Sequence, residues 1–168
     1  MKIGILGGSF NPPHLGHVYI ANLALKSLKL DYVWFLPAKQ NPLKNDGVDF
    51  RKRADLCHNL VKNNPRIKVS DFELQVKSNY IYDILKDLKK RNRQIRFIWL
   101  MGADCLYQFH LWKNWSKFID ENEIIVFDRD DFFHKAVRSR AFIYAKGRVK
   151  LVKCKKIDLS SSLIRRLS

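Results

Sequence analysis

Two histidines near the N-terminus, His14 and His17, stand in the stretch GGSFNPPHLGH, which begins at Gly7. On a helix, residues three apart share a face, so the two imidazoles would be neighbours. Imidazole can bind metal, pack in a core or donate hydrogen bonds to phosphate oxygens. Metal binding is disfavoured, because the stretch lacks the glutamate of HExxH and no nearby Cys or His completes a ligand set. The core and phosphate interpretations both stay open on these residues.

The glycines of this stretch would allow the backbone to approach a phosphate group closely. They follow a short apolar run, residues 2–6, which predicts a strand. Their spacing fits neither the GxGxxG fingerprint nor the GxxxxGK[ST] phosphate loop. Pro12 and Pro13 would stiffen the entry to the next helix and fix where His14 points. Any phosphate binding here must therefore use a different arrangement.

The elements that would position this stretch alternate between strand and helix. Short apolar runs predict strands at residues 2–6, 31–36, 67–72, 95–101, 123–127 and 148–152. Helical patterns run from His14 to Leu28, from a cap at Asp49 to Asn63, and onward from a cap at Ser78. This alternation predicts an α/β, doubly wound fold with a mostly parallel sheet.

Ligands of such sheets bind beyond the C-terminal ends of the strands, near the point where the strand order reverses. The loops after Leu6, Leu36 and Met101 would lie there. The run from Ile95 to Met101 is apolar almost throughout, which is typical of a buried central strand. We therefore expect the functional site at this edge of the sheet.

Length and charge narrow the class of protein. The chain has 168 residues, which favours a single domain spanning 1–168, and its 46% of hydrophobic residues is typical of a globular chain. The formal net charge is +16. Roughly half of this excess would be solvated surface charge. The rest favours an anionic partner such as nucleic acid, a membrane surface or a phosphorylated substrate.

The cysteines and the apolar runs bear on the compartment. Three widely spaced cysteines without a CxxC pair argue against a disulfide framework or a zinc knuckle, so Cys57 and Cys105 are interpreted as buried free thiols. The N-terminal apolar run is too short and too glycine-broken for a signal peptide. No run approaches the ~18 apolar residues of a membrane span. The sequence predicts a soluble, cytoplasmic protein without a membrane partner.

Two motifs carry a family resemblance. GSFNPPHLGH, Gly8 to His17, resembles the G-x-F-x-P-x-H-x-G-H signature of the HxGH nucleotidyltransferase superfamily, whose members transfer an adenylyl or cytidylyl group from a nucleoside triphosphate. Near the C-terminus, SSSLIR, Ser160 to Arg165, resembles the second signature of that superfamily, I-S-S-T/S-x-x-R. The two motifs stand in the expected order at opposite ends of the chain. Together they form a specific signal.

Three internal stretches narrow the resemblance to bacterial nicotinate-nucleotide adenylyltransferases. KSNYIYDILKDL (77–88) is similar to their S-Y-T-x-D-T-L helix start, FIWLMGADCLYQFHLWKNW (97–115) to F-I-x-G-x-D-x-L-x-x-F-x-x-W, and PAKQNPLK (37–44) to P-x-x-x-P-P-H-K. The resemblance implies a Rossmann-like fold. It also implies adenylyl transfer from ATP to nicotinate mononucleotide, giving nicotinic acid adenine dinucleotide and pyrophosphate in NAD biosynthesis.

The resemblance assigns one group of residues to ATP. The catalytic residues would be His14, His17 and Arg165: the imidazoles hold and polarise the phosphate chain, His17 steadies the transferring phosphorus, and Arg165 holds the β- and γ-phosphates. The surroundings of the nucleotide would come from Gly7, Gly8, Ser9, Phe10, Gly102, Asp104, Ser160, Ser161 and Ser162. Mg²⁺ would accompany ATP, and no residue is assigned as a metal ligand.

A second group would bind the pyridine mononucleotide. Trp112 would stack on the pyridine ring, and the backbone amides of Ile81 and Lys113 would hold the nicotinate carboxylate. Such donors favour the acid over the amide, whose NH₂ cannot accept those hydrogen bonds. Lys44 would reach phosphate from its loop. On their own residue types, Asp104 could equally cap a helix and Trp112 could equally be a core residue.

The chain departs from the family pattern at four places. Leu43 replaces a histidine, Ile81 replaces a threonine, and Arg129-Asp130-Asp131 replaces R-P-G. The chain also stops at Ser168, where family members usually continue through a further helix, so the resemblance implies a truncated final helix. These departures put in doubt the substrate contacts of the loop and the support of Arg165.

Other functions stay open on the sequence. The same chemistry could act on nicotinamide mononucleotide or phosphopantetheine, and an inactive family member would keep the same motifs. Basic clusters such as KDLKKR (86–91) and KCKK (153–156) suggest a nucleic-acid-binding module, although no helix-turn-helix or RNA-binding signature accompanies them. Association into a homo-oligomer is also left open.

Overall fold

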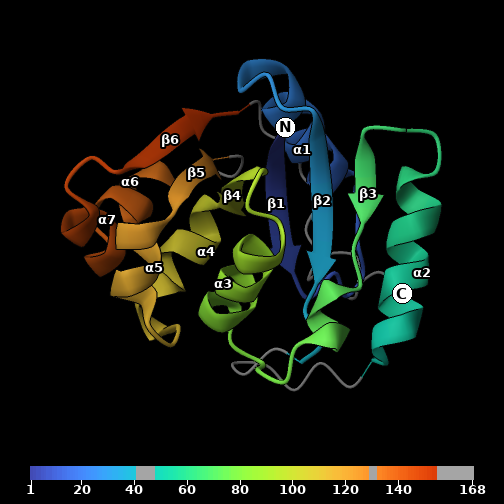
Figure 1. The fold of residues 1–168 in the computed structure, drawn as a ribbon. Helices are drawn as coiled ribbons and strands as arrows, with labels where there is room; N and C mark the ends of the chain where they lie inside the picture. Colours follow the sequence, from blue (N-terminus) through green and yellow to red (C-terminus); the bar gives the residue numbers. More distant parts are fainter. Residues whose placement is uncertain (41–47, 129–131, 155–168) are drawn as a thin grey trace.

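The computed structural model describes residues 1–40, 48–128 and 132–154 (Figure 1). Over these residues, parallel strands form one sheet in the order β3-β2-β1-β4-β5-β6. The strands are β1 (Lys2–Gly8), β2 (Tyr32–Pro37), β3 (Ile67–Val69), β4 (Arg96–Gly102), β5 (Glu123–Asp128) and β6 (Val149–Lys153). The order reverses at β1, because β2 and β3 lie on one side of it and β4 to β6 on the other. The predicted doubly wound α/β fold is confirmed.

Helices cover both faces of the sheet (Figure 1). One face carries α1 (Leu15–Ser27) and α2 (Phe50–Val61), and the other carries α3 (Ile81–Arg91), α4 (Ala103–Gln108), α5 (Trp115–Glu121), α6 (Phe133–Val137) and α7 (Arg140–Ala145). Side chains of β4 alternate between these layers. Ile98 and Leu100 pack on the α1 side, whereas Phe97, Trp99 and Met101 pack on the α3 side. This double burial explains why the strand reads as continuously apolar.

The helix starts test the predicted caps. Asp49 is the N-cap of α2, and its carboxylate accepts hydrogen bonds from the backbone N–H groups of Arg51 and Lys52, as predicted. The Ser78 prediction is wrong, because the N-cap of α3 is Tyr80. The Ser78 hydroxyl instead accepts from the Tyr80 N–H at 3.1 Å and donates to the Asp83 carboxylate at 2.7 Å. Ser78 therefore orders the turn that precedes the helix.

The third predicted strand, 67–72, is shorter in the structure. It ends at Val69, and Phe72–Gln75 form a 3₁₀ helix, η1. The Ser70 hydroxyl accepts from the Phe72 N–H at 3.3 Å, which favours a turn over a continued strand. Phe72 is buried against the core although it lies outside the strand. Its apolar side chain made the run look longer than it is.

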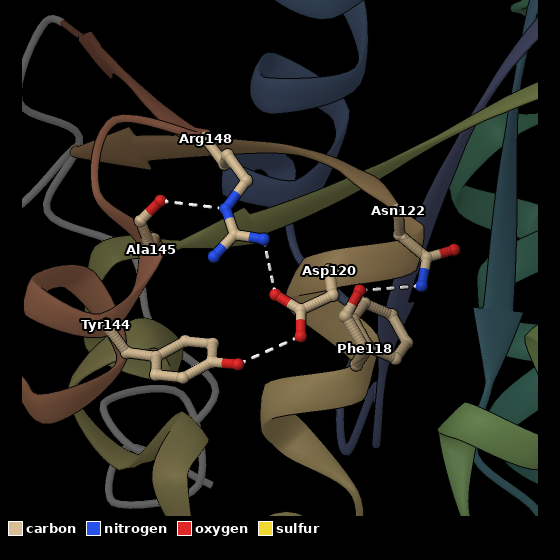
Figure 2. A network of polar contacts seen from close by, with 6 residues as sticks. All are labelled: Phe118, Asp120, Asn122, Tyr144, Ala145 and Arg148. Carbon is tan, nitrogen blue, oxygen red and sulfur yellow. Dashed lines mark hydrogen bonds and ion pairs between the residues drawn. The ribbon is translucent and has the colours of Figure 1, made fainter.

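The segments after β4 pack through polar contacts as well as through the core (Figure 2). Asp120 on α5 accepts from the Tyr144 hydroxyl at 2.9 Å and forms an ion pair with Arg148. The Arg148 Nε also donates to the Ala145 carbonyl at 3.1 Å. These contacts join α5 to α7 and to Arg148, the residue that precedes β6. They hold the helices in place beside β5 and β6.

Candidate active site

The β1, β2 and β4 strands end together at the edge where the strand order reverses. A pocket of about 400 Å³ opens there and is lined by Gly7, Gly8, Ser9, Ala38, Gln40, Glu73, Asn79, Tyr80, Ile81, Trp99, Cys105, Leu111, Trp112 and Lys113. A larger hollow of about 600 Å³ beside His110 contains none of the predicted site residues. We therefore place the candidate site in the smaller pocket, where a doubly wound sheet is expected to bind its ligand.

His14 and His17 lie directly against each other, with ring centroids 3.9 Å apart. His14 is the N-cap of α1, so the helix begins one residue later than predicted, and the His14 Nδ1 accepts from the Gly16 N–H at 3.1 Å. The Nδ1 of His17 accepts from the His14 N–H, also at 3.1 Å. In a neutral ring, the proton must then sit on Nε2. Both imidazoles are thus held in the tautomer whose Nε2–H is a hydrogen-bond donor.

Phe10 supports this pair through its side chain. Its ring is 2% exposed, stacks on Phe35 with centroids 5.0 Å apart, and contacts the His17 ring at 4.8 Å. Its φ of 48° is unusual for a residue other than glycine and turns the chain sharply after β1. The resemblance gave Phe10 a backbone role at the nucleotide. The structure adds that its ring fixes the position of His17.

Three glycines of the predicted site differ in whether the structure has space for a Cβ atom at their position. A Cβ on Gly7 would collide with the Trp99 indole, whereas a Cβ on Gly8 would meet Phe10 at an ordinary 3.6 Å. A Cβ on Gly102 would collide with the carboxylate of Asp104, which folds back over the start of α4. Asp104 is exposed and is not the cap of that helix, because the N-cap is Gly102.

Ile81, Trp112 and Lys113 line the same pocket as the glycine loop, although they are distant from it in the sequence. Trp112 is half-buried, and its ring packs against Phe109 with centroids 4.7 Å apart. The Lys113 ammonium lies 4.2 Å from the centre of the Tyr80 ring. Trp112 is thus both part of the core and part of the pocket wall, so the two interpretations of this residue are compatible.

The start of α3 presents backbone donors at this wall. Its N-cap, Tyr80, makes no side-chain capping hydrogen bond. The first N–H groups of a helix, including that of Ile81, lack an intrahelical partner and carry partial positive charge. Two buried polar atoms of residues lining the pocket, Asn79 Oδ1 and Trp99 Nε1, also have no partner in the part of the chain that the structure describes. The Asn79 oxygen is an acceptor and calls for a donor, so it is the N–H groups at the start of α3 that suit this end of the pocket to an anionic group.

Sequence reasoning missed two buried charged residues near the pocket, Arg53 and Glu73, each 4% exposed. A Glu73 carboxylate oxygen accepts from the backbone N–H of Lys39 at 2.7 Å. Burial raises the pKa of Glu73 to about 7, against the opposing effects of the Lys39 hydrogen bond and of the positive charges on Lys39 and Arg53. Neither residue belongs to a motif. Their partners lie far away in the sequence, so no local pattern marks them.

The comparisons with known proteins agree with this geometry. Residues 5–167 match the sequence family described as cytidylyltransferase-like. The chain belongs to this family. Among curated relatives, a probable nicotinate-nucleotide adenylyltransferase of Ruegeria sp. is 40% identical over 150 residues, covering 89% of this chain and 79% of that protein. One from Parvibaculum lavamentivorans, with the same name, is 43% identical over 143 residues, covering 84% and 71%.

Solved structures support the cytidylyltransferase-like fold. A Plasmodium falciparum nicotinic acid mononucleotide adenylyltransferase complexed with NaAD superposes with a TM-score of 0.81. The two sequences are 22% identical, and the match covers 98% of this chain and 82% of that one. A second structure of the Plasmodium falciparum protein, complexed with APC, has a TM-score of 0.77 at 21% identity, with the same coverage. The family resemblance predicted from the motifs is confirmed.

Several predicted residues of this cytidylyltransferase-like chain lie outside the described residues: Lys44, Ser160, Ser161, Ser162 and Arg165. Within the described ranges, no group of three His, Cys, Asp or Glu side chains could hold a metal ion, and no helix is long and apolar enough to cross a membrane.

Cys57 is buried, as predicted, and burial raises its pKa to about 12, so its thiol stays neutral. Cys105, by contrast, is only partly buried and lines the pocket.

Proposed function

We propose that this protein transfers the adenylyl group of ATP to nicotinate mononucleotide, releasing pyrophosphate and forming nicotinic acid adenine dinucleotide. The observation that carries the proposal is the pocket in which Ile81, Trp112 and Lys113 meet the loop that leads to His14 and His17. The glycine loop that we assign to phosphate and an aromatic wall thus adjoin at one edge of the sheet. The names of the curated relatives support the same reaction.

The reaction requires positioning and charge stabilisation. A phosphate oxygen of the mononucleotide attacks the α-phosphorus of ATP in line, the bond from that phosphorus to the bridging oxygen breaks, and pyrophosphate leaves with the electron pair. No protein nucleophile takes part. The protein must bring two anions together and neutralise the charge that develops on the leaving group. The Nε2–H groups of His14 and His17, oriented by their Nδ1 hydrogen bonds, are the donors we assign to the phosphate chain.

Mg²⁺ would belong to the substrate. Magnesium in nucleotide enzymes usually binds through substrate phosphates, water and one or two carboxylates. Among the described residues, no group of three His, Cys, Asp or Glu side chains could hold a metal ion, and we propose that the ion arrives on the triphosphate. Its chemistry there would be to neutralise phosphate charge. By the family resemblance, Arg165 and Ser160 to Ser162 would complete the triphosphate site, and Lys44 would contact phosphate.

A choice of the acid over the amide follows from the start of α3. The Ile81 N–H is an uncapped helix donor, and the backbone N–H of Lys113 is the second donor that the resemblance assigns; both residues line this wall. A carboxylate accepts from both N–H groups, whereas an amide NH₂ faces them with donors of its own. Trp112 would provide the flat surface for the positively charged pyridinium ring.

The decisive experiment is a substrate panel with pyrophosphate detection. ATP and Mg²⁺ are held constant while nicotinate mononucleotide, nicotinamide mononucleotide and phosphopantetheine are compared. We expect the highest kcat/KM with nicotinate mononucleotide. A higher value for the amide would overturn the acid assignment. Absence of pyrophosphate with all three acceptors, together with tight and salt-sensitive RNA binding, would instead favour a nucleic-acid-binding protein.

A further inference from the structure

Arg53 lies on α2, behind the pocket wall, and is 4% exposed. Its guanidinium donates to four backbone carbonyls. Nη1 reaches Ser9 at 2.6 Å, and Nε reaches Val48 at 3.1 Å. Nη2 reaches Ala38 at 2.7 Å and Lys39 at 3.3 Å. The residues that line the pocket do not include Arg53, so it does not face the substrate space itself.

Holding these carbonyls with a buried charge costs desolvation free energy. A buried cation loses its hydration, and that loss is normally offset by a carboxylate. In the described ranges, no carboxylate lies within ion-pair distance of the guanidinium. Its hydrogen-bond acceptors there are neutral carbonyls, and the Phe50 ring lies 5.7 Å from its central carbon. Glu73 is near enough for the charge of Arg53 to lower its pKa but makes no direct ion pair with it, so the cost of burying the guanidinium is offset mainly by its hydrogen bonds to the carbonyls.

Three of the four carbonyls, those of Ser9, Ala38 and Lys39, belong to segments that form the candidate site. Ser9 lies in the loop between β1 and the histidine pair, while Ala38 and Lys39 follow β2. Ser9 and Ala38 both line the pocket. The Ala38 N–H also donates to the Gly8 carbonyl at 2.9 Å. Arg53 thus joins the two loops at the point where each borders the substrate space.

Glu73 and Arg53 bind the two backbone groups of the same residue, Lys39, which belongs to this wall. The Lys39 carbonyl accepts from Arg53, and the Lys39 N–H donates to Glu73. The Lys39 ammonium further donates to the Val76 carbonyl at 3.1 Å. The backbone after β2 is therefore held between α2 and the 3₁₀ segment that contains Glu73. A shift of Arg53 would be transmitted to both the glycine loop and this wall.

We propose that Arg53 is a positioning residue for the transfer reaction, because its guanidinium fixes the Ser9 loop relative to the Ala38–Lys39 wall. This inference rests on the proposed adenylyl transfer, in which the two phosphate groups must meet in line. A lysine at this position keeps the charge but cannot reach four carbonyls with a planar, fixed set of donors. Displacement of reacting groups by about 1 Å can cost about 10²-fold in rate.

The test compares Arg53→Lys and Arg53→Met with Arg51→Lys and Arg51→Met. Arg51 is an exposed residue on the same helix and serves as the matched control. We expect kcat of Arg53→Lys to fall at least ~10-fold with KM for ATP changing less, and both Arg51 variants to match the wild type. Wild-type kinetics for Arg53→Lys, with activity lost only in Arg53→Met, would show that charge suffices and would overturn positioning.

Chemical rescue separates positioning from folding. We expect low millimolar guanidinium to restore part of the kcat of Arg53→Ala, and not that of Arg51→Ala, while potassium at equal ionic strength restores neither. Hydrogen exchange should also be faster at residues 8–10 and 38–40 of Arg53→Lys, with the strand amides of β4 and β5 unchanged. Faster hydrogen exchange over the whole chain of Arg53→Lys, or failure of both Arg53→Lys and Arg53→Ala to fold, would assign Arg53 to stability and overturn the proposal.

The wild type in the same assay distinguishes the two proposals. An inactive wild type contradicts the proposed reaction, and the exchange experiment then decides only whether Arg53 orders the Ser9 loop and the Ala38–Lys39 wall. An active wild type with an equally active Arg53→Lys contradicts only the positioning role.

Discussion

The backbone N–H of His14 donates to Nδ1 of His17 at 3.1 Å, while the two rings lie 3.9 Å apart. The first histidine therefore fixes the tautomer and the orientation of the second. This relationship makes the pair a unit, since each ring uses its Nδ1 on the backbone at the start of α1 and presents Nε2–H elsewhere.

Replacement of His17 by alanine is expected to lower kcat by at least ~10²-fold, on the scale of one lost transition-state donor. Steady-state pyrophosphate release measures it. His58→Ala is the control, because His58 is exposed on α2 and lies outside the pocket. An unchanged turnover number for His17→Ala would refute the assigned role.

Trp112→Ala should raise KM for the pyridine mononucleotide and leave KM for ATP nearly unchanged, because Trp112 lines the pocket opposite the glycine loop. Trp115→Ala is the matched control. Trp115 packs on Tyr144 with centroids 5.0 Å apart and does not line the pocket. Its loss should reduce stability while both KM values stay close to those of the wild type. Equal effects of the two variants on the pyridine KM would contradict this prediction.

Gly7→Ala should destabilise the fold by about 1–3 kcal/mol, the usual cost of overpacking, because the new methyl group meets the Trp99 indole. Gly8→Ala should cost less, since its methyl group meets Phe10 at an ordinary contact distance. Denaturant unfolding of both variants measures the difference. Equal free energies of unfolding would show that Trp99 moves aside at little cost.

Glu73 should make stability depend on pH. Its pKa in the folded protein, about 7, lies above the 4.5 of an ordinary glutamate, which applies in the unfolded chain, so folding takes up a proton between these values. The contribution of this group is complete below pH 4.5 and is lost as pH rises to about 7. A pKa shift of this size makes the ionised form of Glu73 about 3 kcal/mol less favourable in the folded protein than in the unfolded chain.

The Glu73→Gln variant removes this titration and keeps an acceptor for the Lys39 N–H. We expect the free energy of unfolding of the wild type to fall relative to that of Glu73→Gln between pH 4.5 and 7.5. Denaturant unfolding at a series of pH values measures it. Parallel curves for the two proteins would show that Glu73 titrates as an ordinary carboxyl group.

The sequence by itself determined the layered architecture and the family. Strand and helix periodicities are local properties, so the apolar run of β4 and the Asp49 cap were recognisable before folding was considered. The motif that contains His14 and His17 was likewise legible, because its glycines, prolines and histidines are consecutive in the chain. Local signals failed at Ser78 and at Phe72, where a side-chain hydrogen bond or core burial competes with the apparent pattern.

Only the tertiary structure decided which distant residues meet. The contact of Gly7 with Trp99, the hold of Arg53 on the Ser9 and Ala38 carbonyls, and the burial that raises the pKa of Glu73 all join segments that no local pattern connects. Hydrogen bonds to backbone carbonyls and desolvation depend on distance in space and hardly on sequence. Local chemistry could therefore be read from the residues, whereas the positioning of that chemistry required the fold.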